Sequence, residues 1–336
     1  MHWEFWPMWL VYLPISLYYI YLSFKAKSFF FFSAANPSIE TGGMFFESKF
    51  SVLQLLPKAY YPTTVYIPTD APIATVMSQL ANNNISFPII IKPNRGERGW
   101  RVQKIDTQQA LAAYLLTNRI DTIIQPFINY SHEFSVFYYR HPTSATGSIS
   151  SVTKKELLHV IGDGKSTLAE LISKNHRAFL QSKTLQEQFQ SDWNTVIPLN
   201  EHKLLVPYGN HARGATFIDV TAQYQYKVLE VFDAIAKAIP DFYYGRFDVK
   251  CESEASLYTG VGLQIVELNG AGAEPAHIYD PNFKFWKAQR VLYQHYKIMY
   301  QIARYNHANS NIPFLSYRMF RQLRKQERQY KKVANG

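Results

Sequence analysis

The sequence predicts a mixed α/β protein, in which strands that carry polar side chains are combined with amphipathic helices. Two apolar strands with alternating polar residues are expected within Tyr243–Pro275. A β-branched strand is expected to end at Lys92, and an amphipathic helix at Lys284–Tyr305. With 336 residues, the chain is long enough for one to three subdomains around a substantial core.

The first 33 residues are expected to form a separate, membrane-associated segment. Residues Phe5–Phe24 contain no charged side chain over 20 residues, which is about the length of one bilayer span, and are rich in Trp and Tyr. Pro14 would kink such a helix near its middle. A membrane anchor is favoured over a buried hairpin, and both a spanning and an interfacial arrangement remain open. If the segment spans, Lys25 and Lys27 indicate that the rest of the chain faces the cytoplasm.

Residues 34–86 are expected to form a short region ahead of the strand that ends at Lys92. The residues predict a strand at Phe29–Ala34, a loop around Asn36 and Gly42-Gly43, and a helix that starts near Glu47.

The strand that ends at Lys92 leads directly into a turn rich in glycine and arginine, Asn94–Gly99. A lysine at a strand end, followed by a flexible loop with Gly96 and Gly99, places a cation and backbone N–H groups where they can surround a polyphosphate. This segment therefore predicts a phosphate-binding loop.

A hinge is expected within Ile123–Tyr139, where a strand breaks at Gln125-Pro126 and resumes at Glu133. Pro126 removes a backbone donor, which favours an edge or a hinge over a central strand. Such a hinge, from Gln125 to Phe127, would offer free backbone groups to a flat base, and Glu133 would accept hydrogen bonds from ribose hydroxyls.

Two carboxylates are expected to meet on the paired strands near the C-terminal end of the fold. A turn between residues 257 and 258 would place Asp248 opposite Glu267, and Ile265, Glu267 and Asn269 would share one face. Like charges directly opposite each other destabilise a sheet, so something must neutralise them. Two carboxylates and an amide oxygen suit Mg²⁺. The alternative is a solvated hairpin with two acidic residues on its outer face, and these residues alone do not decide between the two.

The segment His159–Thr167 ends like a phosphate-binding P-loop, but that pattern requires a glycine where His159 stands. A turn at Gly162–Gly164, followed by a helix with a capping box from Thr167 to Glu170, is the better interpretation. The single cysteine, Cys251, is expected to be a packed core thiol.

The order of these pieces resembles the ATP-grasp superfamily, and D-alanine–D-alanine ligases in particular, over residues 47–281. The motifs that carry the resemblance are ESKFSVLQ, FPIIIKP, HEFSV, GRFDV and VELNGAG, in that order. The GDGKST stretch resembles a segment of cyanophycin-synthetase-like members. The resemblance implies an ATP-grasp fold, in which two α+β subdomains grip ATP within residues 87–310, preceded here by a shortened N-terminal subdomain.

The resemblance also implies roles for individual residues. Lys49 and Lys92 would contact the ATP phosphates, and Arg246 would stabilise charge near the transferred phosphoryl group. The residues expected at the nucleotide are Lys49, Lys92, Gly96, Gly99, Gln125, Phe127, Glu133 and Arg213. Those expected at Mg²⁺, or at Mn²⁺ in its place, are Asp248, Glu267 and Asn269. Lys154 and Lys155 are weaker candidates for the nucleotide, and Glu274 for the acceptor-substrate loop.

The activity implied is ATP-dependent ligation of a carboxylate to an amine through an acyl phosphate. The family holds its first amino acid with an N-terminal subdomain that is shortened here, so the small-molecule substrates stay open. Two alternatives are a membrane-tethered ATP-binding sensor without turnover, and a ligase that acts on a larger cell-envelope precursor.

The C-terminal residues 311–336 are expected to form a basic tail. Seven Lys or Arg and one Glu lie between Arg318 and Lys332, within a chain of net charge +10. Anionic lipid is one partner that such a tail fits, and a solvated, partly frayed tail is the alternative. Nucleic acid is not expected, because no reading module accompanies the basic run. The oligomeric state stays open.

Overall fold

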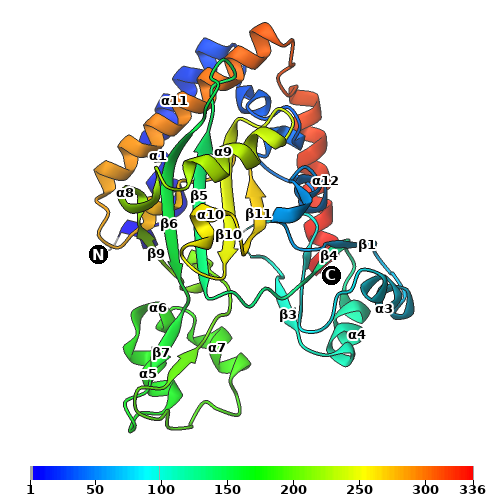
Figure 1. Ribbon diagram of the computed structural model, residues 1–336, viewed down its shortest axis with the longest axis vertical. Helices are drawn as coiled ribbons and strands as arrows, with labels where there is room; N and C mark the ends of the chain where they lie inside the picture. The colour runs from blue at the N-terminus through cyan, green and yellow to red at the C-terminus, as the bar shows by residue number, and fades with distance from the viewer. Residues whose placement is uncertain (1–2, 98, 336) are drawn as a thin grey trace.

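A five-stranded antiparallel sheet forms the centre of the molecule in the computed structural model, which describes residues 3–97 and 99–335 (Figure 1). The strands follow one another across the sheet in the order β11-β10-β5-β6-β9. Their bounds are β5 His132–Tyr139, β6 Ser148–Glu156, β9 Thr216–Asp219, β10 Tyr244–Cys251 and β11 Leu263–Asn269. The mixed α/β class expected from the sequence is confirmed.

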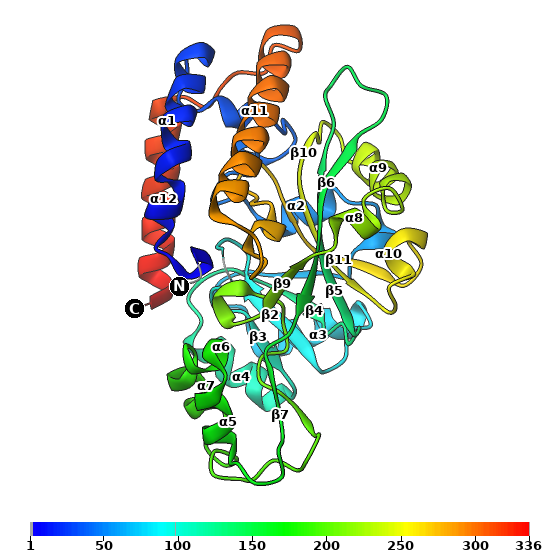
Figure 2. The same ribbon diagram turned by 90° about the vertical axis from the view of Figure 1, so that its left-hand side faces the viewer.

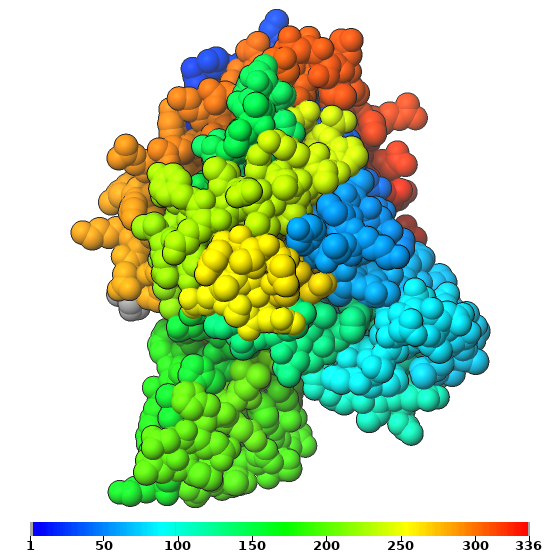
Figure 3. Space-filling model, viewed as in Figure 1, coloured from blue at the N-terminus to red at the C-terminus, as the bar shows by residue number. Residues whose placement is uncertain are grey.

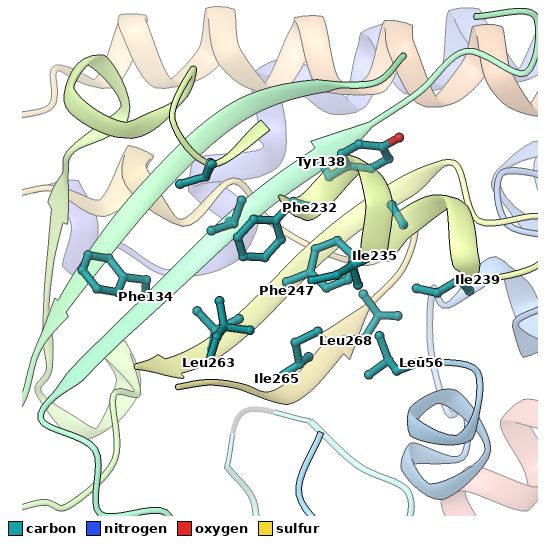
Figure 4. Packing of buried hydrophobic residues seen from close by; sticks show 14 of the residues in the cluster. Leu56, Phe134, Tyr138, Phe232, Ile235, Ile239, Phe247, Leu263, Ile265 and Leu268 are labelled. Atoms are coloured by element: carbon teal, nitrogen blue, oxygen red, sulfur yellow. The ribbon is translucent and has the colours of Figure 1, made fainter. Parts of the chain in front are cut away.

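Three helices cover one face of this sheet: α8 (Thr221–Tyr224), α9 (Leu229–Ala238) and α10 (Ser256–Thr259). Figure 4 shows the core between them, where side chains of α9 meet those of the strands. Cys251 is buried in this core, as expected, and burial raises the pKa of its thiol to about 12.

The other face of the sheet carries a longer helix, α11 (Phe285–Asn309), which starts one residue after the predicted Lys284. Phe137 and Tyr244 from the sheet pack in one cluster with Met299 of α11. Figure 2 shows the resulting layers: α8–α10, the sheet, α11, and then α1 (Met8–Ala26) and α12 (Tyr317–Asn335) at the outer edge.

Two smaller lobes project from this body, and Figure 3 shows an open notch between them. One lobe is a four-stranded sheet in the order β1-β4-β2-β3, with α3 and α4. Its elements are β1 Val65–Ile67, α3 Ile73–Asn82, β2 Ile89–Pro93, β3 Gln103–Ile105, α4 Gln108–Thr117 and β4 Thr122–Pro126.

The second lobe pairs β7 with β8 and packs α5, α6 and α7 against them. Its elements are β7 His159–Ile161, α5 Leu168–Lys174, α6 His176–Phe179, α7 Ser182–Gln188 and β8 His202–Leu204. The P-loop-like segment is structural here, because Thr167 and Glu170 form the expected capping box at the start of α5.

The N-terminal residues pack onto the body as an integral part of the fold. No helix in the described part of the chain is both long enough and apolar enough to cross a membrane. One side of α1 is buried against α11, with Val11 and Leu22 almost fully enclosed. Trp3, in the short helix η1 (Trp3–Phe5), donates from its indole to the carbonyl of Phe283 at 2.6 Å.

Two local predictions in the next region differ in outcome. The strand predicted at Phe29–Ala34 is wrong, because these residues form a 3₁₀ helix, η2 (Phe31–Ala34), whose aromatic rings fit between α1 and α11. The helix predicted near Glu47 exists as α2 (Lys49–Gln54), capped by Ser48. The remaining short helices are η3 Glu40–Gly42, η4 Lys58–Tyr60, η5 His211–Arg213 and η6 Ala276–Tyr279.

The basic C-terminal segment is a helix rather than a frayed tail. Phe320 of α12 stacks near Phe30, and the hydroxyl of Tyr330 donates to the carbonyl of Asp121 at 3.0 Å. Arg101, just after the glycine-rich loop, donates to the carbonyl of Ala334. The helix therefore ties the body to the lobe that carries β2 and β4.

Candidate active site

A cavity of about 630 Å³ lies where the central sheet meets the two lobes. It is lined from below by β2 and the hinge after β4, from above by β10 and β11, and at one end by the N-terminal residues Glu4–Met8. Almost all of the site residues expected from the sequence line it together: Lys49, Lys92, Gly96, Gly99, Gln125, Phe127, Glu133, Arg246, Asp248, Glu267 and Asn269.

The two carboxylates face each other as the sequence predicted. Asp248 on β10 is the register partner of Glu267 on β11, and Arg246 is the partner of Asn269. The connection is a longer loop that contains α10, not a tight turn.

A β-bulge corrects one detail of the predicted face. The register shifts between Asp248 and Val249, which then pairs with Ile265 and leaves Val266 as the extra residue. Ile265 consequently points into the core beside Leu268 rather than sharing a face with Glu267 (Figure 4).

Cations of the chain itself surround the buried Asp248. Arg246 contacts its carboxylate through Nε at 3.1 Å and Nη2 at 3.0 Å, and Lys155 Nζ lies 3.2 Å from Oδ1. The hydroxyl of Ser135 and the amide of Asn269 also donate to it. Although burial opposes ionisation, Arg246 and Lys155 hold the pKa of Asp248 well below its usual value.

Glu267 has its own cation, because Lys49 Nζ lies 2.8 Å from its Oε1. Burial opposes ionisation here too, but Lys49 lowers the pKa of Glu267. Lys49, Arg246 and Lys155 therefore neutralise the carboxylate pair. A metal ion is not required for that purpose.

The fit of Mg²⁺ to this place rests on the chemistry of the donors. Two carboxylates and an amide, in register on neighbouring strands and lining one cavity, are oxygen donors of the kind Mg²⁺ takes beside phosphates. No cluster of three or more His, Cys, Asp or Glu that could hold a metal occurs within residues 3–97 and 99–335. The donors thus suit a metal that arrives with a polyphosphate, rather than one caged by the protein alone.

Lys92 stands at the end of β2 and donates to the carbonyl of Val266 at 3.1 Å. Its side chain is buried, and this desolvation lowers its pKa to about 8 despite the nearby Glu267. An anion that enters the cavity would offset this desolvation and stabilise the charged form of Lys92.

The strand breaks after Pro126 as predicted, and Gln125, Pro126 and Phe127 line the cavity. Two parts of the prediction are wrong: β4 is a central strand of its sheet, and the backbone N–H of Phe127 is not free. Gln125 donates from its amide to the hydroxyl of Thr64 at 2.8 Å, and the backbone N–H of Phe127 donates to the carbonyl of Pro88 at 3.0 Å. The ring of Phe127 lies under two cations, Lys104 at 5.1 Å and Lys250 at 5.3 Å.

Glu133 is buried beside this hinge, in an ion pair with Lys155 at 3.1 Å, and also accepts from the N–H of Gly209. Lys155 lines the cavity, although the sequence marked it only as a weaker candidate. Strand alternation separates it from Lys154, which instead pairs with Glu254 at 2.8 Å.

The glycine-rich loop closes one side of the cavity. Gly96 and Gly99 have backbone φ angles of +130° and +69°, which residues other than glycine rarely adopt. Arg98 lies outside the described residues. Arg213 is not among the described residues that line the cavity, because the 3₁₀ turn η5 directs its neighbours His211 and Ala212 there instead.

The N-terminal end of the cavity was missed by the sequence analysis. Glu4 accepts two hydrogen bonds from Arg177, at 2.9 and 2.8 Å, and lies 3.0 Å from His211. Trp6 and Met8 line the cavity beside them. An uncharged, aromatic-rich run predicts burial in a membrane or in a protein equally well, and only the position of α11 decides between them.

Comparisons with known proteins give weak similarities. No family model and no curated protein matches the chain. Among solved structures, it is similar to a bifunctional glutathione synthetase from Pasteurella multocida, with 16% identity, a TM-score of 0.41, and coverage of 74% of this chain and 36% of that one.

Two other solved structures are similar to a comparable degree. VanG D-Ala:D-Ser ligase from Enterococcus faecalis has 17% identity and a TM-score of 0.41, and covers 76% of this chain and 62% of that one. D-alanine–D-alanine ligase from Bacillus anthracis has 12% identity and a TM-score of 0.43, and the similarity covers 76% of this chain and 68% of that one. These are ATP-grasp ligases, the group that the sequence motifs resemble. The chain spans about a third of the first and less than two thirds of the second, so the similarities are too weak to assign its activity.

Proposed function

We propose that this protein is an ATP-dependent ligase that joins a carboxylate to an amine through an acyl phosphate. The observation that carries the proposal is the grouping of Lys49, Lys92, Lys155 and Arg246 around the Asp248–Glu267 pair in one cavity. Cations packed against two carboxylates provide the charge balance that Mg-ATP needs.

In this proposal, Lys49 and Lys92 bind the polyphosphate, and Lys49 leaves Glu267 to do so. Arg246, held in place by Asp248, stabilises the negative charge that develops on the transferred phosphoryl group. The residues that would hold Mg²⁺ are Glu267, Asn269 and Asp248, and the ion would supply neutralisation of the phosphate charge.

The decisive experiment measures ADP release with Mg-ATP, pooled amino acids and small carboxylates. We expect acceptor-dependent ADP release in the wild type and none in Glu267→Gln. ADP release that is equal in both proteins would exclude Glu267 from the chemistry.

An ATP-binding sensor without turnover is the second candidate. What favours it is that the described residues between α1 and β1 form only short helices, η2, η3, α2 and η4, where the resemblance to ATP-grasp ligases implies a subdomain that holds the first amino acid. A sensor would raise its melting temperature with Mg-ATP and release no ADP with any acceptor, and that pair of results would replace the ligase proposal.

We also propose that the protein binds the surface of an anionic bilayer from the cytoplasmic side, without spanning it. The exposed side of α1 is apolar along its length: Trp9, Leu17 and Phe24 are 69%, 71% and 77% exposed. On α12, basic side chains at three- and four-residue spacing are exposed: Arg318, Arg321, Lys325, Arg328 and Lys332. Both helices lie at the same edge of the molecule in Figure 2.

The exposed surface of α12 carries its basic side chains, whereas its acidic side chain is buried. Its one acidic residue, Glu327, is buried, where it pairs with Arg324 and Lys331. An apolar strip for the acyl boundary and a basic strip for anionic headgroups suit one partner, a negatively charged lipid surface.

Sedimentation with vesicles tests this surface. Each basic residue near an anionic membrane contributes about 1 kcal/mol. The variant Arg321→Gln/Lys325→Gln/Arg328→Gln should therefore bind phosphatidylglycerol-containing vesicles on the order of 100-fold more weakly. Leu13→Gln/Leu17→Gln should weaken binding to the same vesicles even at high salt.

A matched control removes the same charge elsewhere, with Lys58→Gln/Lys165→Gln/Lys183→Gln, all exposed residues outside α1 and α12. If this control and the α12 variant bind the vesicles equally well, the proposed lipid-binding surface is wrong. A dimeric wild type that becomes monomeric with the α12 substitutions would also contradict the lipid surface, because this face would then join two copies of the protein.

A further inference from the structure

The cavity has a second, chemically different end, formed by the N-terminal residues and the loop after β11. The lining there includes Trp6, Met8, Ala273 and Ala276, which are apolar, together with the carboxylate-bearing Glu274. The opposite end, called the phosphate end below, holds Lys49, Lys92 and Lys155 around the Asp248–Glu267 pair. Arg246 lies between the two ends, and Arg177 at the N-terminal end is paired with Glu4.

Glu274 is held by two tyrosines from opposite ends of the chain. The hydroxyl of Tyr12, on α1, donates to Oε1, and the hydroxyl of Tyr279, in η6, donates to Oε2 at 3.0 Å. Burial and the neighbouring Glu274 raise the pKa of Tyr12 well above its usual value, so Tyr12 stays a donor.

Glu274 differs from three other acidic residues at the cavity, whose negative charges are each balanced by a cation of the chain. Glu4 is paired with Arg177, Glu133 with Lys155 and Glu267 with Lys49. Among the described residues, none of the cations forms an ion pair with Glu274. A half-buried carboxylate held only by neutral donors favours an external cation.

Glu274 is also tied to the reacting end of the cavity. Its carbonyl accepts from Nη1 of Arg246 at 2.9 Å. Burial opposes the charge of Arg246, but Asp248, then Glu267 and then Glu274 raise the pKa of that arginine. A group bound at Glu274 therefore lies next to the residue proposed to act on the phosphoryl group.

We propose that Glu274 binds the ammonium group of the amine substrate and accepts its proton, with Trp6 and Met8 contacting an apolar substituent. The inference rests on the proposed ligase function. The ammonium gives one proton to Glu274, and the freed nitrogen lone pair attacks the carbonyl of the acyl phosphate. The C–N bond forms, the C–O bond to phosphate breaks, and phosphate leaves with the electron pair and the second nitrogen proton.

Hydroxylamine separates this step from the formation of the acyl phosphate, because it is uncharged at neutral pH and needs no base. In a first assay, the wild type is given Mg-ATP, hydroxylamine and a pool of carboxylates, and hydroxamate is measured. In a second assay, the carboxylate so identified is offered with leucinamide or glycinamide, and amide formation is measured.

We expect Glu274→Gln to lower amide formation about 100-fold, while hydroxamate formation changes less than about threefold and the KM for ATP is unchanged. Glu274→Asp should restore part of the amide formation, since it keeps the charge. Leucinamide should be a better acceptor than glycinamide in the wild type, and Trp6→Ala should remove that preference. Glu230→Gln, on the exposed side of α9, is the matched control for loss of a carboxylate.

The outcomes separate the two proposals. A wild type that forms no hydroxamate with any carboxylate refutes the ligase and this inference with it. Hydroxamate formation in the wild type, with amide and hydroxamate lowered equally or not at all in Glu274→Gln, overturns the role of Glu274 alone. Melting temperatures of both Glu274 variants identify any loss that comes from unfolding.

Discussion

The two ends of the cavity differ in where their residues come from and in how their charges are balanced. At the phosphate end, Lys92, Asp248 and Glu267 stand on β2, β10 and β11, and each carboxylate has a cation of the chain beside it. At the other end, Tyr12 and Glu274 are 262 positions apart and are joined by one hydrogen bond, which the uncharged hydroxyl of Tyr12 donates. In the two proposals, the first end binds a polyanion and the second binds a small cation.

The comparison also separates local from long-range information. The phosphate end is written in short motifs whose strands place the side chains directly. The N-terminal end exists only because α1 packs along α11, which brings Glu4, Trp6 and Tyr12 over the loop after β11. Four changes test this difference, from the largest expected effect to the smallest.

Glu267→Gln should abolish ATP turnover at the phosphate end. We expect turnover to fall on the order of 10³-fold or more, about 4 kcal/mol in the barrier, because the carboxylate expected to balance Mg-ATP is lost. The melting temperature should change little, since the pair with Lys49 is partly exposed. Circular dichroism and ADP release measure the two effects, and an active variant would refute the proposed metal ligand.

Trp3→Ala tests whether the N-terminal segment belongs to the fold. Trp3 is 9% exposed and its indole donates to Phe283, so we expect a loss of about 3 kcal/mol in the free energy of unfolding. Thermal unfolding without detergent or lipid measures it. An unchanged transition would show that the segment is dispensable for the body, as a separate anchor would be.

The pH dependence at Lys92 should reveal its buried charge. Because burial lowers its pKa to about 8, the lysine is charged below that pH and loses its charge above it. We expect kcat/KM for ATP to fall about tenfold per pH unit above 8. The same burial penalises the folded state while the unfolded lysine is still charged. This penalty is complete below pH 8 and is relieved as pH rises from 8 towards the usual lysine value.

Lys92→Arg provides the control for that profile. Arginine stays charged throughout this range, so kcat/KM for ATP should be lower at pH 7 but flat between pH 7 and 9. A wild-type profile that is itself flat would mean that Lys92 does not govern ATP binding.

Tyr12→Phe tests the second end with a small change. It removes one donor to Glu274, and the loss of about 1 kcal/mol should raise the KM for the amine about fivefold while the KM for ATP stays the same. Tyr19→Phe, on the same helix, removes a hydroxyl that donates to the carbonyl of Phe29 and should leave both values unchanged. Equal rises for amine and ATP in Tyr12→Phe would indicate a general loosening rather than a substrate contact.

Parts of the fold and of the site followed from short stretches of sequence. A turn assumed between residues 257 and 258 put Asp248 opposite Glu267, and strand alternation put Cys251 into the core. The capping box at Thr167 fixed the start of α5. The bulge that turns Ile265 inward was not predictable, because a one-residue insertion in the register leaves no mark in the pattern.

The lysine at a strand end, the glycine-rich loop and the carboxylates of two neighbouring strands could be located from the sequence, because short motifs and the pairing of consecutive strands place them. The positions of α1 and α12 could not, because they depend on packing between segments far apart in the chain. A run such as Phe5–Phe24 has the same favourable transfer from water into lipid as into a protein interior, so its composition fits both. The packing of α1 on α11, and of α12 on Phe30 and Phe45, made the choice. With it, Tyr12 came within hydrogen-bonding distance of Glu274.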